Sequence, residues 1–216
     1  MRKKKWAEPY LEEHSSFAFR DPIEMKGKWK EVLSCEKLHV EIGCGKGDYF
    51  NTMAEMYPET GWVAIEKDVS AAAVACKKSL EEYVNNNRKR MIVNDASNLL
   101  EWFEKREIDV IHLNFSDPWP KKYTHKRRLS SKKFLEMYQV LLSVNGYIRM
   151  KTDNKDLFES SIIYFLENGF TLTELSVDYR RQKHDEDAIT EYERRFMELG
   201  QPIYLLIAKP VIINKE

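Results

Sequence analysis

Short apolar segments alternate with amphipathic helical segments along most of this 216-residue chain, and this alternation limits the fold more than any other feature. Strands that alternate with helices at this spacing predict a mostly parallel sheet in an α/β protein. The predicted strands cover residues 38–42, 62–66, 90–93, 108–115, 147–151, 170–177 and 203–208. No regular crossover joins the last two of them, so we expect the final strand to run antiparallel.

The predicted helices lie between these strands. Helical spacing of apolar residues, with Pro or Gly at several ends, predicts helices over residues 48–57, 68–84, 97–105, about 130–144 and 155–168. The fold class is therefore a doubly wound sheet of about seven strands with helices on both faces. Residues 1–36 are polar and aromatic, and Pro9 and Pro22 interrupt them. We interpret them as an N-terminal extension with one or two short helical turns, followed by a single domain over residues 37–216.

Composition excludes several classes of protein. Lys and Arg number 35, as do Asp and Glu, so only a local concentration of charge can indicate a nucleic-acid partner. The three cysteines form no CxxC pair, which argues against a disulfide framework or a zinc site. The basic start is not followed by an apolar segment, and no apolar run approaches the roughly 20 residues of a membrane helix. We expect a cytoplasmic protein without metal or membrane contacts.

A glycine-rich loop follows the first predicted strand. Glycines at Gly43, Gly45 and Gly47 stand where a sheet of this kind binds nucleotides. Because position 48 is Asp, the GxGxxG fingerprint of dinucleotide binding is absent, and so is the GK[ST] of a P-loop. A GxGxG loop preceded by the acid Glu41 is the form found in S-adenosylmethionine enzymes.

Acidic residues stand at the ends of four successive predicted strands, namely Glu41, Glu66, Asp95 and Asp117. The carboxyl ends of parallel strands meet at one edge of a sheet, so these side chains should surround one crevice. A carboxylate at Glu66 can accept both ribose hydroxyls, and Asp95 can accept the adenine amino group. Each acid alone could instead cap the helix after it. The four acids together with the glycine loop favour a cofactor site.

The loop after the fourth predicted strand reads Asn114-Phe-Ser-Asp-Pro-Trp-Pro-Lys-Lys122. Two prolines fix their own φ angles and restrict the residues before them, so Asp117 should be held stiffly beside the crevice. Trp119 offers a surface on which a base can stack, which contributes roughly 1–3 kcal/mol per base. The alternative interpretation is a rigid surface turn in which Trp119 is only a hydrophobic plug.

A basic stretch follows this loop. No acidic residue stands between Asp117 and Glu136, whereas eight Lys, Arg and His residues do. Such a run is usually a solvated face. Its position beside the proposed site in a chain of net charge +0 favours a phosphate-rich substrate. The basic residues at 2–5 could extend the same field.

The chain resembles the bacterial tRNA (guanine-N7-)-methyltransferases. The matching motifs appear in family order from about residue 26 to 209, and the NFSDPWPKK segment together with KTDN and TEYE is highly specific. The matching segments are Val40–Gly47, Ala64–Glu66, Asn94–Ala96, Leu113–Lys122, Lys126–Leu129, Lys151–Asn154, Thr190–Glu193 and Gly200–Ile203.

The resemblance implies a Rossmann-like class I methyltransferase that moves a methyl group from S-adenosylmethionine to N7 of a guanine in the tRNA variable loop. It implies cofactor contacts at Glu41, Gly43, Gly45, Gly47, Glu66, Asp95, Ala96 and Asp117, with Asp117 also the candidate catalytic residue. It implies substrate contacts at Lys121, Asp153, Thr190, Glu191, Tyr192 and Glu193. It implies RNA contacts at Tyr123, Thr124, His125, Lys126, Arg127 and Arg128.

The chemistry agrees with this assignment. Guanine N7 carries a free lone pair at neutral pH, so the reaction needs proximity and alignment more than a general base. Asp153 and Glu193 can accept hydrogen bonds from the guanine N1–H and 2-amino groups, and Lys121 can donate to O6. Asp117 could orient either the cofactor or the base. Asp153 could also cap the helix over 155–168.

Other functions remain open at this point. A methyltransferase acting on another RNA or on a non-RNA substrate is the first alternative, and the basic stretch and Trp119 argue against a protein or a small molecule as that substrate. A non-catalytic RNA-binding protein is the second, and the acids at every strand end argue against it. A nicotinamide oxidoreductase is a distant third because position 48 is not glycine. The expected partner is tRNA, and the protein is expected to be a monomer or homodimer.

Overall fold

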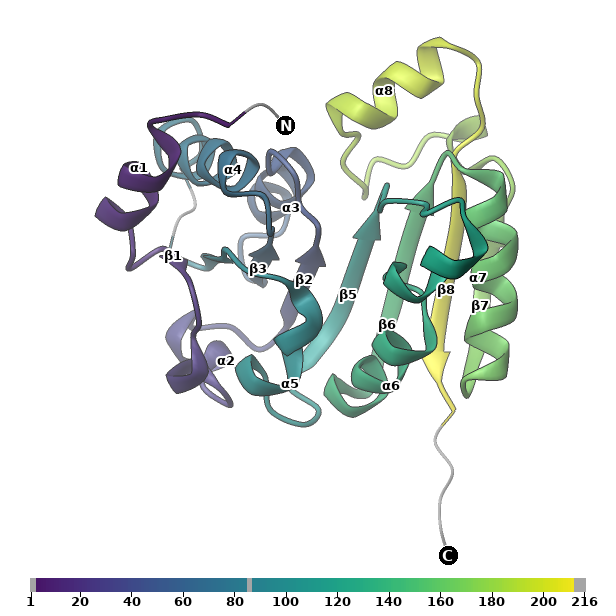
Figure 1. The fold of residues 1–216 in the computed structure, drawn as a ribbon, viewed down its shortest axis with the longest axis horizontal. Coiled ribbons are helices and arrows are strands. Elements are labelled where there is room, and N and C mark those ends of the chain that lie inside the picture. Colours follow the sequence, from purple (N-terminus) through teal and green to yellow (C-terminus); the bar gives the residue numbers. More distant parts are fainter. Residues whose placement is uncertain (1–2, 85–86, 212–216) are drawn as a thin grey trace, which may run out of the picture.

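The structure, a computed structural model, describes residues 3–84 and 87–211. Within these residues eight strands form one sheet in the order β1-β4-β3-β2-β5-β6-β8-β7 (Figure 1). Neighbouring strands are parallel except that β8 is antiparallel to β6 and β7. The predicted sheet with an antiparallel last strand is confirmed. The strands are β1 (Ala18–Phe19), β2 (Leu38–Ile42), β3 (Gly61–Ile65), β4 (Lys89–Ile92), β5 (Ile108–Asn114), β6 (Leu142–Thr152), β7 (Phe170–Ser176) and β8 (Tyr204–Pro210).

Side-chain caps begin several of the helices. Asp68 accepts from the Ala71 N–H at 2.8 Å and so begins α4, as predicted, although α4 ends at Glu81 rather than at Val84. The helix predicted over residues 97–105 is two short turns, η2 and α5. The α-helices are α1 (Ala7–Glu13), α2 (Trp29–Val32), α3 (Asp48–Met56), α4 (Val69–Glu81), α5 (Leu99–Trp102), α6 (Lys132–Leu141), α7 (Lys155–Glu167) and α8 (Glu191–Glu198). The 3-10 helices are η1 (Ile23–Met25), η2 (Ala96–Asn98), η3 (Lys122–Arg127) and η4 (Tyr179–Arg181).

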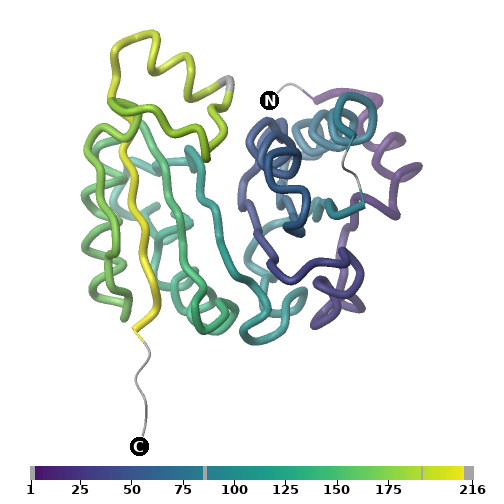
Figure 2. The backbone as a smooth tube through the Cα atoms, turned by 180° about the vertical axis from the view of Figure 1, so that it is seen from behind, coloured from purple at the N-terminus to yellow at the C-terminus, as the bar shows by residue number. Residues whose placement is uncertain are grey.

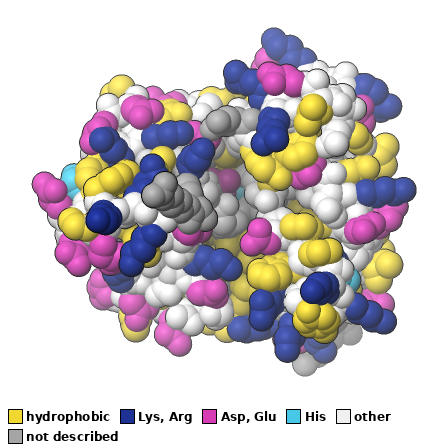
Figure 3. All heavy atoms as spheres, turned by 45° about the horizontal axis from the view of Figure 1, so that its top comes forward, with side chains coloured by type: hydrophobic (Ala, Val, Ile, Leu, Met, Phe, Trp, Pro, Cys, Tyr) yellow, Lys and Arg dark blue, Asp and Glu magenta, His cyan; other side chains and the backbone are white. Residues whose placement is uncertain are grey.

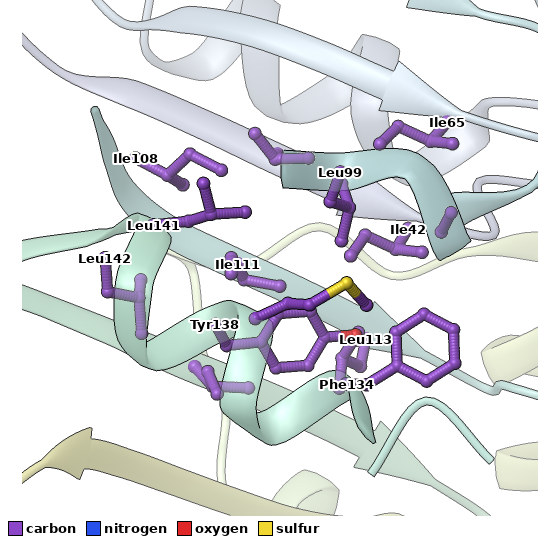
Figure 4. Close-up of a cluster of buried hydrophobic side chains, with 14 of the residues drawn as sticks. Ile42, Ile65, Leu99, Ile108, Ile111, Leu113, Phe134, Tyr138, Leu141 and Leu142 are labelled. Carbon is purple, nitrogen blue, oxygen red and sulfur yellow. The ribbon is translucent and has the colours of Figure 1, made fainter. Parts of the chain in front are cut away.

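Two buried clusters cover opposite faces of the sheet. Side chains of α2, α5, α6 and α7 pack on one face, where Phe134 and Tyr138 of α6 lie against Ile111 and Leu113 of β5 (Figure 4). Side chains of α3 and α4 pack on the other face, over β3 and β4, with α1 outside α4 (Figure 2). Helices therefore lie on both faces, as predicted.

The first 36 residues add more than the predicted helical turns. Ala18 and Phe19 pair with Met91 and Ile92 of β4, so β1 extends the sheet by one short parallel strand. Trp29 of α2 is fully buried, and its indole N–H donates to the Trp102 carbonyl at 2.8 Å. No periodicity predicts a strand of two residues, because such a strand depends on the partner it meets.

The carboxyl ends of the parallel strands carry the loops that the sequence singles out. The glycine loop follows β2, the Pro-Trp-Pro loop follows β5 and the KTDN segment ends β6. After β7 the chain crosses back above these ends, and Figure 1 shows α8 over the tips of β5 and β6. This end of the sheet therefore collects the predicted site residues.

Candidate active site

Two adjoining cavities open at the carboxyl ends of the strands, and Gly43 and Phe115 line both. The first, cavity A, measures about 410 Å³, and the second, cavity B, is of equal size. Among the residues that line cavity A are the predicted cofactor residues Gly43, Glu66, Asp95, Ala96 and Asp117. Cavity B is lined by the predicted residues Glu41, Gly43, Gly45, Thr190 and Tyr192. The acids from four strand ends thus line two adjoining cavities, Glu66, Asp95 and Asp117 in cavity A and Glu41 in cavity B.

The three glycines of the loop have different surroundings. All have positive φ angles, +79° at Gly43, +56° at Gly45 and +79° at Gly47. A Cβ atom at Gly43 or Gly45 would meet no heavy atom within 4 Å, so a ligand can approach the backbone there. A Cβ atom at Gly47 would lie 2.8 Å from the Cβ of Ala75 in α4. Gly47 is buried and is required for helix packing, and it lines neither cavity.

Glu41 and Asn114 form a buried polar pair at cavity B. The Asn114 amide nitrogen donates to Glu41 Oε1 at 2.8 Å. Glu41 Oε2 and Asn114 Oδ1 are both buried acceptors with no hydrogen-bond partner. Burial raises the pKa of the Glu41 carboxyl to about 7, against the lowering effects of the Asn114 hydrogen bond and of Lys151. Two unpaired acceptors beside a cavity favour a ligand that carries a cationic donor, because buried acceptors are rarely left unpaired.

Glu66 and Asp95 stand on the other side of the crevice, in cavity A. The Glu66 carboxylate accepts from the backbone N–H groups of Gly45 at 2.9 Å and Asp68 at 2.8 Å, so it also fixes the glycine loop. Burial raises the pKa of Glu66, although these N–H groups oppose the shift. Asp95 accepts from the Ser97 N–H at 2.9 Å and thereby caps η2. Both acids therefore combine a local structural contact with a place in the cavity wall.

A group of acidic and aromatic side chains gathers around Tyr192 of α8. The Tyr192 ring lies 5.1 Å from that of Phe115, whose φ angle is +51°. Burial and the charges of Asp153 and Asp117 raise the pKa of the Tyr192 phenol. Asp153 follows β6, is half-buried, and has a pKa raised by that burial. The cap of α7 is Asn154, not Asp153.

The Pro-Trp-Pro loop is held by one buried arginine. Arg128 is only 2% exposed, and its guanidinium donates to the Pro118 carbonyl at 2.7 Å, to Ser160 Oγ at 2.6 Å and to the Trp119 carbonyl at 3.5 Å. Trp119 has a φ of +42°, a strained conformation that surrounding contacts must maintain. The guanidinium of Arg127 lies 4.9 Å from the Trp119 ring centroid, at the wall of cavity A.

The predicted RNA contacts differ in exposure. Tyr123, Lys126 and Arg127 are exposed on η3, whereas Thr124 and His125 are half-buried. His125 Nδ1 lies 3.1 Å from the Tyr164 hydroxyl. Figure 3, turned toward this end of the molecule, shows Lys and Arg side chains spread over both halves of it. Lys121 is exposed just before η3, and Arg2 lies outside the described residues.

The TEYE motif has its residues on different sides of α8. Thr190 caps the helix by accepting from the Glu193 N–H at 2.9 Å, and both Thr190 and Tyr192 face cavity B. The Glu193 side chain is fully buried and forms ion pairs with Lys151 at 2.9 Å and Arg180 at 2.6 Å. Glu191 begins α8, and its side chain lies outside the described part of the chain.

Sequence reasoning did not single out several residues of this site. Asn114 and Ser116 lie inside the NFSDPWPKK segment, from which only Asp117, Trp119 and Lys121 received individual roles. A polar residue inside an apolar strand, such as Asn114, was the available signal. Lys151 lies in the KTDN motif, but nothing in the sequence signals that it pairs with Glu193 and Asp187 or that Arg180 joins them, because these segments meet only in the folded chain.

Metal clusters and membrane helices are both missing from the described chain. Within residues 3–84 and 87–211, no group of three or more His, Cys, Asp or Glu side chains is placed to hold a metal ion. No helix of the described chain has the length and apolar character needed to cross a membrane.

Comparison with known proteins identifies the family. The sequence model of a family described as "Putative methyltransferase" matches residues 35–206. The tRNA (guanine-N(7)-)-methyltransferase of Oceanobacillus iheyensis is 42% identical over 204 residues, covering 94% of this chain and 95% of that protein. The enzyme of the same name from Listeria monocytogenes is 42% identical over 210 residues, covering 97% of each.

The fold also matches solved structures. A 16S rRNA (adenine(1408)-N(1))-methyltransferase from Catenulisporales acidiphilia, solved with its cosubstrate SAM, superimposes with a TM-score of 0.61. It is 11% identical and covers 88% of this chain and 92% of that one, so this likeness concerns the fold. The similarity over nearly the whole chain confirms the resemblance seen in the motifs, and the chain belongs to the tRNA (guanine-N7-)-methyltransferase family.

Proposed function

We propose that this protein transfers the methyl group of S-adenosylmethionine to N7 of a guanine in the variable loop of tRNA. The observation that carries the proposal is the pair of unpartnered buried acceptors, Glu41 Oε2 and Asn114 Oδ1, at cavity B, which adjoins cavity A. The names of the relatives supply the substrate class.

The cavities fit the two ends of this cofactor. Cavity B has the two acceptors that the methionine ammonium needs, and the open backbone at Gly43 and Gly45 leaves room for the chain that joins it to the ribose. Cavity A has Glu66 for the ribose hydroxyls and Asp95 with Ala96 for the adenine. Carboxylate acceptors make charge-assisted bonds, which are stronger than neutral ones. The residues present therefore match the donors that the cofactor offers.

The guanine is proposed to enter where the two cavities meet. Asp117 lines cavity A and Tyr192 lines cavity B, and the charges of Asp117 and Asp153 both raise the pKa of Tyr192. Asp153 is proposed to accept from the guanine N1–H or 2-amino group. Adenine has no N1–H and no 2-amino group, so this contact selects guanine. The complete burial of Glu193 and its two ion pairs favour a positional role for this residue over a direct contact.

The reaction requires alignment more than proton transfer. S-adenosylmethionine would supply a methyl group on a positively charged sulfur: the lone pair of N7 would form the new N–CH3 bond as the S–CH3 bond breaks, the sulfur would leave as a neutral thioether, and the positive charge would pass to the guanine. The rigid loop holds Asp117 at the edge of cavity A, where it orients the reactants. Holding two reactants in line can contribute about 7–11 kcal/mol of barrier reduction. The ring of Tyr192 against Phe115 helps to exclude water from the mouth of the crevice.

The exposed residues of η3 are proposed to hold the tRNA backbone. Tyr123, Lys126 and Arg127 lie next to the Pro-Trp-Pro loop, so phosphate contacts there would bring the RNA to the crevice. Phosphate contacts position a nucleic acid without reading its sequence. Arg128 is proposed to support this surface from below rather than to touch RNA, because its guanidinium is bonded to loop carbonyls.

The proposed function is tested by finding which class of molecule accepts the methyl group. Purified protein is incubated with cofactor labelled in the methyl group and with total tRNA, ribosomal RNA or total protein in separate reactions. We expect label in the tRNA fraction, and its absence from a parallel reaction with Asp117→Ala. Label confined to ribosomal RNA or protein would reject the proposed substrate, and cofactor binding without label in any fraction would favour a non-catalytic binder.

A further inference from the structure

A buried network of ion pairs ties α8 to the sheet. The network contains three cations, Arg149 and Lys151 of β6 and Arg180 of η4, and two anions, Asp187 and Glu193. Lys151 Nζ lies 2.8 Å from Asp187 Oδ2 and 2.9 Å from Glu193 Oε2. Arg180 contacts the same two carboxylates, with Nη2 2.6 Å from Asp187 Oδ2 and Nε 2.6 Å from Glu193 Oε1. Arg149 Nη1 adds a contact of 2.9 Å to Asp187 Oδ1.

These side chains are almost completely removed from solvent. The exposed fractions are 0% for Lys151 and Glu193, 3% for Asp187 and 4% for Arg180. Burial alone would raise the pKa of Asp187, but Lys151 and Arg149 outweigh it and the pKa is lowered. Tyr49 of α3 also donates to Asp187 Oδ1 at 2.9 Å. Breaking such a network by removing one partner leaves an uncompensated buried charge.

The network gives the glutamate of a capping-box sequence a different role. Thr190-Glu-Tyr-Glu193 has the S/T-x-x-E spacing of a capping box, in which the glutamate returns to the backbone N–H of the cap residue. Thr190 does cap α8, but both carboxylate oxygens of Glu193 are engaged by Lys151 and Arg180. The glutamate therefore fastens the first turn of α8 to β6 and η4.

The opposite side of the same turn faces the candidate active site. Tyr192 stands one residue before Glu193, and its ring packs on Phe115 at the end of β5. Thr190, Tyr192 and Arg195 all line cavity B. The buried side of the turn thus determines where its exposed side lies over the crevice.

We propose that Arg180 and Lys151 are positioning residues for the substrate side of the site. Acting through Glu193 and Asp187, they hold Thr190 and Tyr192 over cavity B. The inference deepens the proposed function and rests on it for the statement that this side receives the guanine. An arginine suits the position because its planar guanidinium offers two separate donors in a fixed geometry, Nε to Glu193 and Nη2 to Asp187, whereas a lysine at 180 would offer a single nitrogen.

Cofactor binding should depend on this network less than the use of tRNA does, with the contact between them limited to cavity B, where Lys151 lowers the pKa of Glu41. Glu66, Asp95 and Ala96 belong to the ends of β3 and β4, and Glu41 with Asn114 belong to β2 and β5. A loosened α8 should therefore change the use of tRNA more than the binding of S-adenosylmethionine. A purely structural role would lower both together.

The experiment compares Arg180→Gln and Arg180→Lys with Arg181→Gln, an exposed neighbour on η4. Hydrogen exchange is measured for the amides of α8 and of β2 and β5, alongside KM for tRNA, kcat and the cofactor dissociation constant. We expect Arg180→Gln to lower the protection of the α8 amides and kcat/KM for tRNA by at least about tenfold, as the loss of a buried ion-pair partner implies. Arg180→Lys should fall between that variant and wild type, and Arg181→Gln should match wild type.

A double variant tests whether Arg180 acts through Glu193. Arg180→Gln combined with Glu193→Gln should lose clearly less than the sum of the two single variants, because both remove the Arg180–Glu193 ion pair although each also removes a contact of its own. Additive losses, unchanged α8 protection, or equal loss of protection in β2 and β5 would each overturn the inference. If Arg180→Gln does not fold, the same comparisons are made with Arg180→Lys in its place. Because hydrogen exchange uses no RNA, it tests the positioning role even if the methylated substrate proves to be another molecule.

Discussion

The side chains of Glu41 and Asn114 meet at a distance of 2.8 Å between Oε1 and Nδ2, and each leaves one buried acceptor unpaired at cavity B. Glu41 is the penultimate residue of β2 and Asn114 is the last residue of β5, and these two strands lie at the centre of the sheet. Their pairing fixes the carboxylate at the point where the glycine loop, the Pro-Trp-Pro loop and α8 converge. The site therefore offers two buried, unpaired acceptors to a cationic group in cavity B.

This arrangement predicts that cofactor affinity depends on pH. Burial raises the pKa of Glu41 from 4.5 to about 7, so the free protein holds a proton there below neutrality. A cationic amine needs the ionised carboxylate, and binding must then release that proton. Affinity should fall as pH drops below about 7, approaching about tenfold per pH unit. Titration of the protein with the cofactor at several pH values between 5.5 and 7.5 measures this dependence of affinity on pH.

Glu41→Gln is the matched control for that titration. It should bind the cofactor more weakly at pH 7.5 and should lose the pH dependence, since no proton is released. A wild-type affinity that is flat across this range would mean that Glu41 does not meet the amine. The raised pKa also affects the stability of the cofactor-free protein. The contribution of Glu41 to the free energy of unfolding is greatest below pH 4.5 and is lost as the pH rises through 7.

Glu66→Ala should weaken cofactor binding more than tRNA binding. Each charge-assisted bond to a ribose hydroxyl that the variant removes should cost about 1.5–3 kcal/mol. The variant also removes the acceptor of the Gly45 and Asp68 N–H groups, so a modest loss of thermal stability should accompany it. Isothermal titration with cofactor and with tRNA separates the two effects. An unchanged cofactor dissociation constant would limit Glu66 to fixing the loop.

The neighbouring residues Arg127 and Arg128 should behave differently. Arg127 is exposed, so Arg127→Gln should weaken tRNA binding and reduce the slope of log affinity against log salt by roughly 0.7–0.9 for each phosphate that the side chain neutralises. Arg128 is buried, so Arg128→Gln should reduce activity and the melting temperature by releasing the Pro-Trp-Pro loop. Affinity for tRNA measured at several salt concentrations tests the role of Arg127. Parallel plots of log tRNA affinity against log salt for wild type and Arg127→Gln would show that η3 is a solvated surface without phosphate contacts from Arg127.

Gly47→Ala and Gly45→Ala should separate packing from binding. Both place a side chain at positive φ, which costs roughly 1–2 kcal/mol. Only Gly47→Ala also forces a Cβ against Ala75, adding about 1–3 kcal/mol for overpacking. Gly47→Ala should therefore melt at the lower temperature, and Gly45→Ala should show the larger loss of cofactor affinity. Equal melting temperatures would contradict the packing role of Gly47.

Much of this architecture could be predicted from the sequence, because strand and helix periodicities are local. The alternation of segments predicts the sheet, and an acid after each of four strands predicts the crevice. Long-range pairings could not be predicted in this way. The strand at Ala18–Phe19 exists only because β4 offers it an edge, and Glu193 meets Lys151 only after η4 and α8 fold back over β6. The boundary at residue 36 and the individual site roles stay predictions.

Nucleoside analysis of tRNA methylated by this protein tests the central claim most directly. A transcript with guanine in its variable loop is incubated with the protein and S-adenosylmethionine, digested and separated by mass, beside a transcript in which those guanines are replaced by adenine. We expect 7-methylguanosine from the first transcript, mapped to the variable loop, and none from the second. A methyl group on another base, on another atom of guanine, or equally on both transcripts would contradict it.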